Sequence, residues 1–438
     1  MRFKLMTLAA VGVATALSIP LAPKVQAAGE QFIPMLVYRT GPYAPSGIPV
    51  ANGFRDYYNL LNKRDGGING VKIVAEECET KYNTKLGVEC YEKLKNKGST
   101  GASLFNPYST GITYQLIPKA AVDKIPILSM GYGRTAAGDG RVFEWVFTAP
   151  TSYWSQASAF IKYIGGKEGG MEKLKDKKIT LIYHNSAYGK EPIPTLETLA
   201  KKYGYKLTLL AVDHPGQEQK STWLQIRRKK PDWILMWGWG VMNQVAVKEA
   251  AGIKFPMDRF IGVWWSGSEA DVIPAGDGAK GYLAGTFHGA GSGYDVHKDI
   301  VKHVYGGDAA KAKGSNIGEV LYNRGLVNAV YTTEAIRTAM AKFGNKPMTG
   351  EQVRWGLENL DLTKAKLGKL GLKGMAQPHK ITCADHEGSG PVMIQQWDGK
   401  KWNFVSDWIS PMRDVVRPKI EAAAAAYAKE NKLKPRGC

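Results

Sequence analysis

The stretch FIPMLVYRTGPYAPSGIPVANGFRDYYNLLNKRDGGINGVKIVAEE, residues 32–77, contains the repeating unit that decides the fold. Its apolar run at 32–38 predicts a buried strand, a helical pattern follows at 51–67, and a second strand is expected at 71–77. Two strands joined through a helix pair in parallel, with the helix packed on one face of the sheet. The stretch therefore predicts an α/β fold.

The same alternation completes a first unit and then starts again. A helical pattern at 83–98 and short apolar runs at 102–105 and 125–130 finish the first unit. A second unit of similar size follows residues 141–152, with strands expected at 178–184, 205–213, 232–237, 259–265 and 281–289. Two such units predict two Rossmann-like, doubly wound lobes with a ligand cleft between them.

Three further elements are expected in the C-terminal third of the chain. They are a long helix at 319–344, a hairpin at 390–408 around Asp398-Gly399 and a late helix at 420–432.

The N-terminus has the pattern of a secretory signal. Two basic residues precede an apolar stretch at 5–19 that is too short to cross a bilayer, and small residues follow at 25–27. We expect cleavage after Ala27, so that residues 1–27 are a signal peptide and the mature protein is periplasmic. An uncleaved membrane anchor is the alternative, and the prolines at 20 and 23 disfavour it.

The chain is strongly basic, with 59 Lys and Arg against 39 Asp and Glu and a formal net charge of +20. The basic residues are spread along the sequence, and clusters such as RRKK at 227–230 are short. We therefore attribute the charge to solubility and the attraction of small anions, and we expect no nucleic-acid partner.

Four cysteines in an oxidising compartment are expected to form disulfides. Cys78 and Cys90 are close in sequence, which leaves Cys383 to pair with Cys438 and pin the C-terminal tail; the other two pairings remain possible. There is no Cys-x-x-Cys motif, and His379, Cys383 and His386 are too loosely spaced for a metal site. We expect neither a metal nor a cofactor.

Aromatic residues gather where the expected strands end. They are Trp237, Trp239, Trp264, Trp265 and Tyr188 in the second unit, and Phe105, Tyr108 and Tyr132 in the first. Ligands of doubly wound sheets bind outside the carboxyl ends of the strands, so these rings are candidates for the walls of the cleft. Packing in the core or at its rim is the alternative.

Six motifs occur in an order and spacing that resemble those of a known family. They are TGPYAPSGIPVANGF at 40–54, GGINGVKI at 66–73, NPYSTGIT at 106–113, IPILSMGYG at 125–133, IYHNSAYGKE at 182–191 and FIGVWWSGS at 260–268. With them the chain resembles the type I periplasmic binding proteins of ABC importers, in the branch that binds leucine, isoleucine and valine. The resemblance implies a monomer whose lobes close on a small ligand and deliver it to a membrane permease.

The resemblance also suggests a division of the chain. Two lobes would be joined by three hinge crossovers. We expect residues 28–148 and 286–385 in lobe 1, residues 149–285 and 386–410 in lobe 2, and a C-terminal extension at 411–438.

The resemblance implies where the ligand is held and where this chain departs from the family. The family's hydroxyl and N–H groups for the ligand carboxylate match Ser109, Thr110 and Gly111, at an expected helix start that favours anions. Ser109 acting only as a helix cap is the alternative. The family's threonine and acidic residue for the ligand ammonium fall on Gly133 and Trp264, and an unpaired buried ammonium is costly. Ordinary amino-acid binding is therefore disfavoured, although Glu269 and Asp271 lie further along the loop.

Aromatic side chains take the places of those polar groups. We expect Trp237, Trp239, Trp264, Tyr188 and Tyr132 to face the cleft, with Tyr43, Phe105 and Tyr153 as weaker candidates and Tyr108, Gly131 and Trp265 beside them. Arg134 is expected to pair with a carboxylate, unless it is a solvated loop residue. The hypothesis is a small carboxylate with an aromatic or apolar body.

Three alternatives remain: binding of branched-chain or other amino acids, a ligand-sensing module of a signalling system, and an enzyme. The GYGRTA stretch at 131–136 has the shape of a dinucleotide fingerprint, but turn and strand residues follow it instead of a helix. We therefore expect no catalytic residues.

Overall fold

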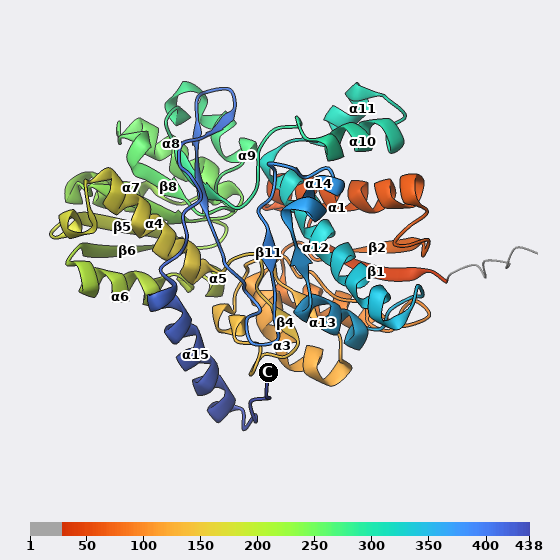
Figure 1. The fold of residues 1–438 in the computed structure, drawn as a ribbon. Coiled ribbons are helices and arrows are strands. Elements are labelled where there is room, and N and C mark those ends of the chain that lie inside the picture. Colours follow the sequence, from red (N-terminus) through yellow and green to blue (C-terminus); the bar gives the residue numbers. More distant parts are fainter. Residues whose placement is uncertain (1–28) are drawn as a thin grey trace, which may run out of the picture.

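The computed structural model describes residues 29–438 (Figure 1). The expected signal peptide, residues 1–27, lies outside the described residues. The fold is mixed α/β, as predicted, and its largest sheet has seven strands, in the order β13-β12-β9-β8-β7-β5-β6. No helix within 29–438 combines the length and the apolar character that a bilayer span requires.

The first part of the molecule, which we call lobe 1, is built around short parallel strands, on the right in Figure 1. The strands β1 and β2 pair in parallel from Gln31↔Ile73 to Val37↔Glu79, and β3 pairs with β4. The elements of lobe 1 are β1 (Gln31–Val37), α1 (Ala44–Asp65), β2 (Ile73–Glu79), α2 (Thr84–Leu94), α3 (Thr110–Asp123), β3 (Ile127–Leu128), η1 (Thr135–Gly138), β4 (Val146–Phe147), α10 (Asp295–His303), α11 (Ala309–Gly314), α12 (Val320–Phe343), α13 (Gly350–Glu358), β10 (Asp361–Leu362), α14 (Lys364–Lys369) and β11 (His379–Lys380).

The second part, lobe 2, is built on the seven-stranded sheet. Its strands β5 to β9 are parallel, and the hairpin β12–β13 is added antiparallel to β9. The elements of lobe 2 are α4 (Tyr153–Lys167), η2 (Met171–Leu174), β5 (Lys178–His184), α5 (Ala187–Lys190), α6 (Ile193–Tyr203), β6 (Lys206–Val212), α7 (Lys220–Lys229), β7 (Trp233–Trp237), α8 (Val241–Gly252), η3 (Met257–Arg259), β8 (Phe260–Gly262), α9 (Glu269–Val272), η4 (Ile273–Ala279), β9 (Leu283–Thr286), β12 (Met393–Trp397) and β13 (Trp402–Phe404).

The late helix α15 (Arg413–Glu430) starts earlier than expected and extends along the outside of both lobes (Figure 1). Its Tyr427 ring stacks on Phe143, with 4.6 Å between the ring centroids. The Cys383–Cys438 disulfide fixes the chain end beyond it, and the Cys78–Cys90 disulfide joins β2 to α2. Both expected pairings are therefore confirmed.

Most expected elements are present, and the differences have local causes. The helix α1 begins seven residues before the expected start because Pro45 fits its first turn, and it ends at Gly66, which adopts φ 71°. The strand expected at 102–105 is wrong: only Phe105 forms a bridge, to Ile127. The strand expected at 259–265 ends at Gly262, so that Trp264 and Trp265 lie beyond the sheet. The hairpin is confirmed, with Trp397 opposite Trp402.

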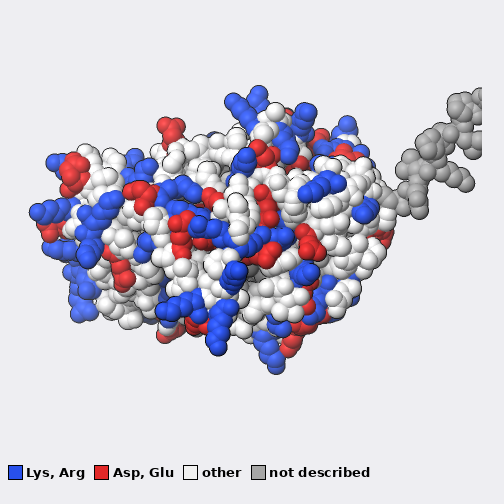
Figure 2. Space-filling view, turned by 60° about the horizontal axis from the view of Figure 1, so that its bottom comes forward, with Lys and Arg blue, Asp and Glu red and all other residues white. Residues whose placement is uncertain are grey.

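Both signs of charge are mixed on the surface that Figure 2 shows. Lysine and arginine side chains outnumber the acidic ones there, but aspartates and glutamates lie among them. This distribution agrees with the scattered basic residues of the sequence.

Candidate ligand-binding site

Aromatic side chains from the two lobes meet directly. The ring of Tyr132, in the loop after β3, stacks on Trp265 of lobe 2, with 4.6 Å between centroids and 28° between planes. On the same side of the interface, Tyr38 and Tyr82 of lobe 1 each lie 6.1 Å from Trp239. Tyr38, Tyr132, Trp239 and Trp265 are buried, so the contact between the lobes is a packed aromatic layer.

A second group of rings belongs to lobe 2. Tyr153, at the start of α4, stacks on Trp264 at 5.4 Å and 25°, and Trp237 lies edge-on to Tyr153 at 6.3 Å. Tyr188 lies 5.3 Å from Tyr153, and its hydroxyl donates to the carbonyl of Gly238 at 2.8 Å. These rings are in place because β5, β7 and β8 end side by side in the parallel sheet.

Seven of the predicted site residues are therefore in one cluster, which we call the aromatic cluster. Its members are Tyr132, Tyr153, Tyr188, Trp237, Trp239, Trp264 and Trp265. Gly131 makes room for it: the residue adopts φ +79°, and a Cβ there would lie 2.5 Å from the Trp264 ring.

Other predicted residues lie at the edge of the cluster or away from it. Tyr108 borders it, 6.4 Å from Tyr132, and accepts a hydrogen bond from Asn328. Phe105 packs instead against Tyr91 in the apolar core of lobe 1, at 4.6 Å. The guanidinium of Arg134 lies outside the cluster, 4.7 Å from the Tyr427 ring of α15.

The residues expected to hold a carboxylate at the start of α3 have partners within the protein. The hydroxyl of Ser109 accepts the N–H of Ile112 at 3.4 Å, which is the cap contact weighed as the alternative. The hydroxyl of Thr110 accepts the N–H of Gly133 at 3.2 Å. A Cβ on Gly111 would lie 2.8 Å from the Thr84 hydroxyl, so the backbone here is closely covered.

Two groups of polar contacts join the lobes beside the rings. The hydroxyl of Tyr43, in lobe 1, lies 3.0 Å from Nε2 of His184 and 2.5 Å from Nδ1 of His214, both in lobe 2. The carboxylate of Glu191, in lobe 2, accepts hydrogen bonds from the Thr135 hydroxyl at 2.6 Å and from the Tyr114 hydroxyl of lobe 1. Burial raises the pKa of Glu191, and the two hydroxyl donors oppose that shift.

Several buried polar atoms in and beside the aromatic cluster have no hydrogen-bond partner among the described residues. They are Nε1 of Trp237, Trp239, Trp264 and Trp265, the hydroxyl of Tyr153, Nε2 of Gln156 and Nη2 of Arg324. A buried polar group left without a partner costs about 1–3 kcal/mol. All of these groups except the tyrosine hydroxyl are donors only, so the missing partner is an acceptor.

Arg324 of α12 belongs to this site and was not predicted. Its side chain is fully buried, and its guanidinium lies 4.8 Å from the Trp265 ring and 4.6 Å from the Phe287 ring. Burial lowers its pKa to about 9, which leaves it protonated at neutral pH. The sequence does contain a signal, because Arg324 is the one charged residue between Glu319 and Glu334, in the otherwise uncharged first half of the helix.

Tyr38, Tyr82 and Gln156 were also missed. Tyr38 directly follows β1 and Tyr82 follows β2, so the strand-end argument that selected the tryptophans applies to both tyrosines. The Gln156 side chain accepts the N–H of Trp264 at 2.8 Å, a contact without a sequence motif.

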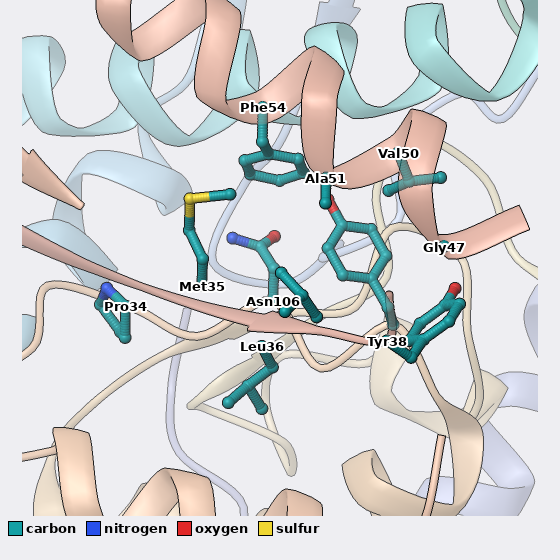
Figure 3. A pocket seen from close by; sticks show the side chains of 11 residues that line it. Pro34, Met35, Leu36, Tyr38, Gly47, Val50, Ala51, Phe54 and Asn106 are labelled. Carbon is teal, nitrogen blue, oxygen red and sulfur yellow. The ribbon is translucent and has the colours of Figure 1, made fainter. Parts of the chain in front are cut away.

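A separate small pocket lies inside lobe 1, between β1 and the first turns of α1 (Figure 3). Its lining includes Met35, Phe54, Asn106 and Tyr108, and its volume is about 10 Å³. That is the space of about one water molecule, so this pocket is a packing gap and not a second ligand site.

Within residues 29–438, no group of three or more His, Cys, Asp or Glu side chains is arranged to hold a metal ion. The cysteines are engaged in the two disulfides. Nε2 of His379 donates to the Glu387 carbonyl at 2.8 Å, and His386 stacks on Phe147 at 3.8 Å.

Comparison with solved structures finds proteins of the same fold, and one of them is also similar in sequence. A protein from the Pseudomonas fluorescens group, described as an ABC transporter permease, is 46% identical and has a TM-score of 0.86; the match covers 94% of this chain and 99% of that one. A branched-chain amino acid ABC transporter protein from Thermus thermophilus with bound valine is 21% identical, with a TM-score of 0.72 over 89% of this chain and 99% of that one. A solute-binding protein from R. palustris in complex with benzoate is 16% identical, with a TM-score of 0.67 over 87% of this chain and 97% of that one. The last two likenesses show the fold alone.

The curated relatives are described as Leu/Ile/Val-binding protein homologues. Leu/Ile/Val-binding protein homolog 8 of Brucella abortus is 24% identical over 298 residues, which is 66% of this chain and 64% of the relative, so the match spans less than two thirds of that protein. A sequence model of the periplasmic binding protein family matches residues 30–401. The expected resemblance is thereby confirmed, and the chain belongs to the periplasmic binding protein family, a family of binding proteins and not of enzymes.

Proposed function

We propose that this protein captures a small aromatic or apolar carboxylate between its two lobes in the periplasm and delivers it to the permease of an ABC importer. The lobe boundaries, the hinge crossovers and the monomeric state expected from the sequence are part of this proposal. The observation that carries it is the set of unpartnered donors among stacked rings in the aromatic cluster.

The rings favour an aromatic or flat apolar ligand. Indole and phenol faces are already stacked in pairs at 4.6 and 5.4 Å, and a ligand ring of similar size can take one place in such a pair. Each such pair adds about 0.5–1.5 kcal/mol beyond the burial of apolar area.

The polar groups favour an anion over an amino acid. The acidic side chains nearest in the chain to Trp264 are engaged elsewhere: Asp271 accepts from Ser268 at 2.8 Å and from Asn243 at 3.0 Å, and Glu269 accepts the N–H of Val320 at 3.0 Å. A ligand ammonium would therefore find no free carboxylate on that loop, whereas a ligand carboxylate would meet donors.

The neighbours of the same fold bind both kinds of ligand. The R. palustris protein was solved with benzoate and the Thermus thermophilus protein with valine. Both chemistries are compatible with the architecture, so the side chains of the site have to decide between them.

The test is a binding screen of the mature protein by thermal shift and calorimetry, with benzoate, phenylacetate, cyclohexanecarboxylate, leucine and valine. We expect the carboxylates to raise the melting temperature and the two amino acids to leave it unchanged. Stabilisation by leucine or valine with no response to any of the carboxylates would contradict the proposal and favour the amino-acid alternative.

Two matched variants connect the binding to the cluster. Trp264→Phe shortens a ring that stacks on Tyr153 and removes its free N–H, so we expect about 2- to 10-fold weaker carboxylate binding. Trp223→Phe is the control: Trp223 is equally buried in lobe 2, but its N–H donates to Gln219 at 3.1 Å, away from the cluster. Equal affinity in both variants would remove Trp264 from the site.

A further inference from the structure

Arg324 is a buried cation without an acidic partner. No carboxylate of the described residues lies within ion-pair distance of its guanidinium, although the side chain is fully buried. Asp271 is close enough to act on it through charge, but the oxygens of Asp271 are engaged with Ser268 and Asn243. Burying a charge without a partner costs free energy of folding, so the burial of Arg324 has to be explained by something other than stability.

The surroundings of Arg324 orient its guanidinium without neutralising it. Its Nε donates to Nε2 of His288 at 2.9 Å, and its Nη1 donates to the carbonyl of Trp264. Since Nε2 of His288 accepts, its Nδ1 carries the proton and donates to the carbonyl of Gly289 at 2.9 Å. Burial and the nearby arginine hold the pKa of His288 well below its usual value, which keeps this ring neutral and accepting.

One nitrogen of the Arg324 guanidinium makes no hydrogen bond within the protein. Nη2 is buried and has no partner, while the rings of Trp265 and Phe287 flank the group at 4.8 and 4.6 Å. Trp265 also stacks on Tyr132 of the aromatic cluster, so the unused N–H groups and the stacked rings belong to one site. A guanidinium presents paired N–H donors that match the two oxygens of a carboxylate.

We propose that Arg324 is the group that binds the carboxylate of the ligand, through Nη2, and that His288 and the Trp264 carbonyl are positioning groups that hold it in place. This inference rests on the proposed function and deepens it. It moves the anion-binding role from Arg134, which contacts α15, and from Ser109 and Thr110, whose hydroxyls are already bonded, to the N-terminal part of α12.

The experiment compares acids with their neutral amides in the wild-type protein and in Arg324→Gln. The probes are benzoate with benzamide, phenylacetate with phenylacetamide, and cyclohexanecarboxylate with its amide, each measured by calorimetry on the mature protein. We expect Arg324→Gln to weaken binding of the acid about 30- to 1,000-fold, as for one partner of a buried charge pair, and to change amide binding less than about 3-fold. Arg337→Gln is the control on the same helix, because Arg337 is 30% exposed and paired with Glu334.

The possible outcomes separate this inference from the proposed function. If the wild-type protein binds none of the six probes, both proposals fail. If it binds the acids and Arg324→Gln binds them equally well, or loses acid and amide to the same degree, the aromatic site stands and Arg324 is not its carboxylate group.

A second variant covers the case in which Arg324→Gln does not fold. Arg324→Lys keeps the charge and replaces the planar fork by a point charge, so we expect it to retain folding and a preference for acid over amide, with acid binding weakened about 10-fold or more. An unchanged affinity for the acid in Arg324→Lys would overturn the assignment, since the lysine side chain has no group equivalent to Nη2 in the plane of the guanidinium.

Discussion

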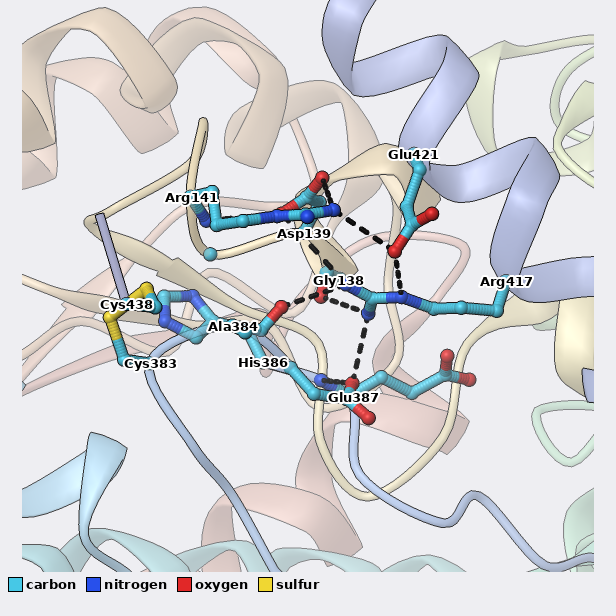
Figure 4. A network of polar contacts seen from close by, with 12 residues as sticks. Gly138, Asp139, Arg141, Cys383, Ala384, His386, Glu387, Arg417, Glu421 and Cys438 are labelled. Carbon is cyan, nitrogen blue, oxygen red and sulfur yellow. Dashed lines mark hydrogen bonds and ion pairs between the residues drawn. A yellow bond between two sulfur atoms is a disulfide. The ribbon is translucent and has the colours of Figure 1, made fainter. Parts of the chain in front are cut away.

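Two arginines of this protein differ in the partners that surround them. Arg417 of α15, 18% exposed, pairs with Glu421 at 3.0 Å and Asp385 at 3.2 Å and also donates to the carbonyls of Gly138 and Ala384 (Figure 4). Arg324 is fully buried and has only neutral acceptors. Arg417, which joins separate parts of the structure, is therefore paired with acidic side chains, and Arg324 is not.

The two surroundings differ in the way that the proposed function requires. The network around Arg417 joins α15 to the loops before β4 and after β11, close to the Cys383–Cys438 disulfide, and nearly every donor in it has a partner (Figure 4). The site around Arg324 and the aromatic cluster keeps donors without partners in the protein interior. Such incomplete satisfaction is expected where a ligand has to complete the set, and under the proposed function the closed arrangement of the lobes would depend on that ligand.

The largest expected effect is a loss of stability when the buried and neutral side chain of His184 becomes protonated at low pH. His184, beside Tyr43 and His214 at the lobe interface, has its pKa lowered to about 4 by burial and then by His214, against the opposing charge of Asp213. The stability it contributes is fully present above pH 6.5 and is lost as the pH falls toward 4. We expect a loss of up to about 3 kcal/mol over that range, measured by urea unfolding.

His184→Gln isolates this effect from the other titrating groups. The raised pKa values of Asp271, about 6, and Glu269, about 7, act in the opposite direction, since stability from these groups falls as the pH rises. The difference in unfolding free energy between wild type and His184→Gln should therefore shrink steadily between pH 6.5 and 4. A difference that is constant over this range would show that His184 is not held neutral.

The next effect tests the comparison directly, with the same substitution at both arginines. Arg417→Met leaves Asp139, whose side chain is 4% exposed, and Asp385 with fewer partners, so we expect about 2 kcal/mol lower stability and unchanged benzoate affinity. Arg324→Met removes a buried charge that has no acidic partner, and this gain offsets the loss of the hydrogen bonds to His288 and the Trp264 carbonyl, so we expect stability within about 1 kcal/mol of wild type.

Urea unfolding and calorimetry on the two methionine variants measure both quantities. Equal losses of stability would mean that Arg324 is satisfied by its neutral acceptors as well as Arg417 is by its acids. The contrast between the two regions would then carry no information about a ligand.

Much of the fold and part of the candidate site could be predicted from the sequence. Alternating apolar runs and helical patterns are local, and they predicted the parallel strands of lobe 2 and the rings at the ends of β7 and β8. The prediction of a strand at 102–105 was wrong because only Phe105 has a backbone partner there, in Ile127. Such pairing depends on residues that are distant in the sequence. Arg134 was favoured because it follows Gly133 in the matched motif, but the ring of Tyr427, nearly 300 residues later, draws its guanidinium toward α15.

Arg324 was missed for a related reason. The helix α12 is recognisable from sequence, but which of its residues faces Trp265 depends on how α12 packs against a loop some 60 positions earlier. A lone charge in an uncharged helical run is the local signal, and its meaning becomes clear only when no acid is found beside it.

The smallest change in stability is expected at an ion pair on the surface, where water solvates both charged groups. Lys202 of α6 and Asp414 of α15 lie 3.5 Å apart with 46% and 73% of their side chains exposed. Such a pair gains little, because solvent screens the charges and both side chains lose freedom, so we expect Asp414→Ala to leave the unfolding free energy unchanged. Urea unfolding at low and at high salt measures this, and a clear loss of stability at low salt that disappears at high salt would mean that α15 is held to lobe 2 by its surface charges and not by its buried face and the network of Arg417.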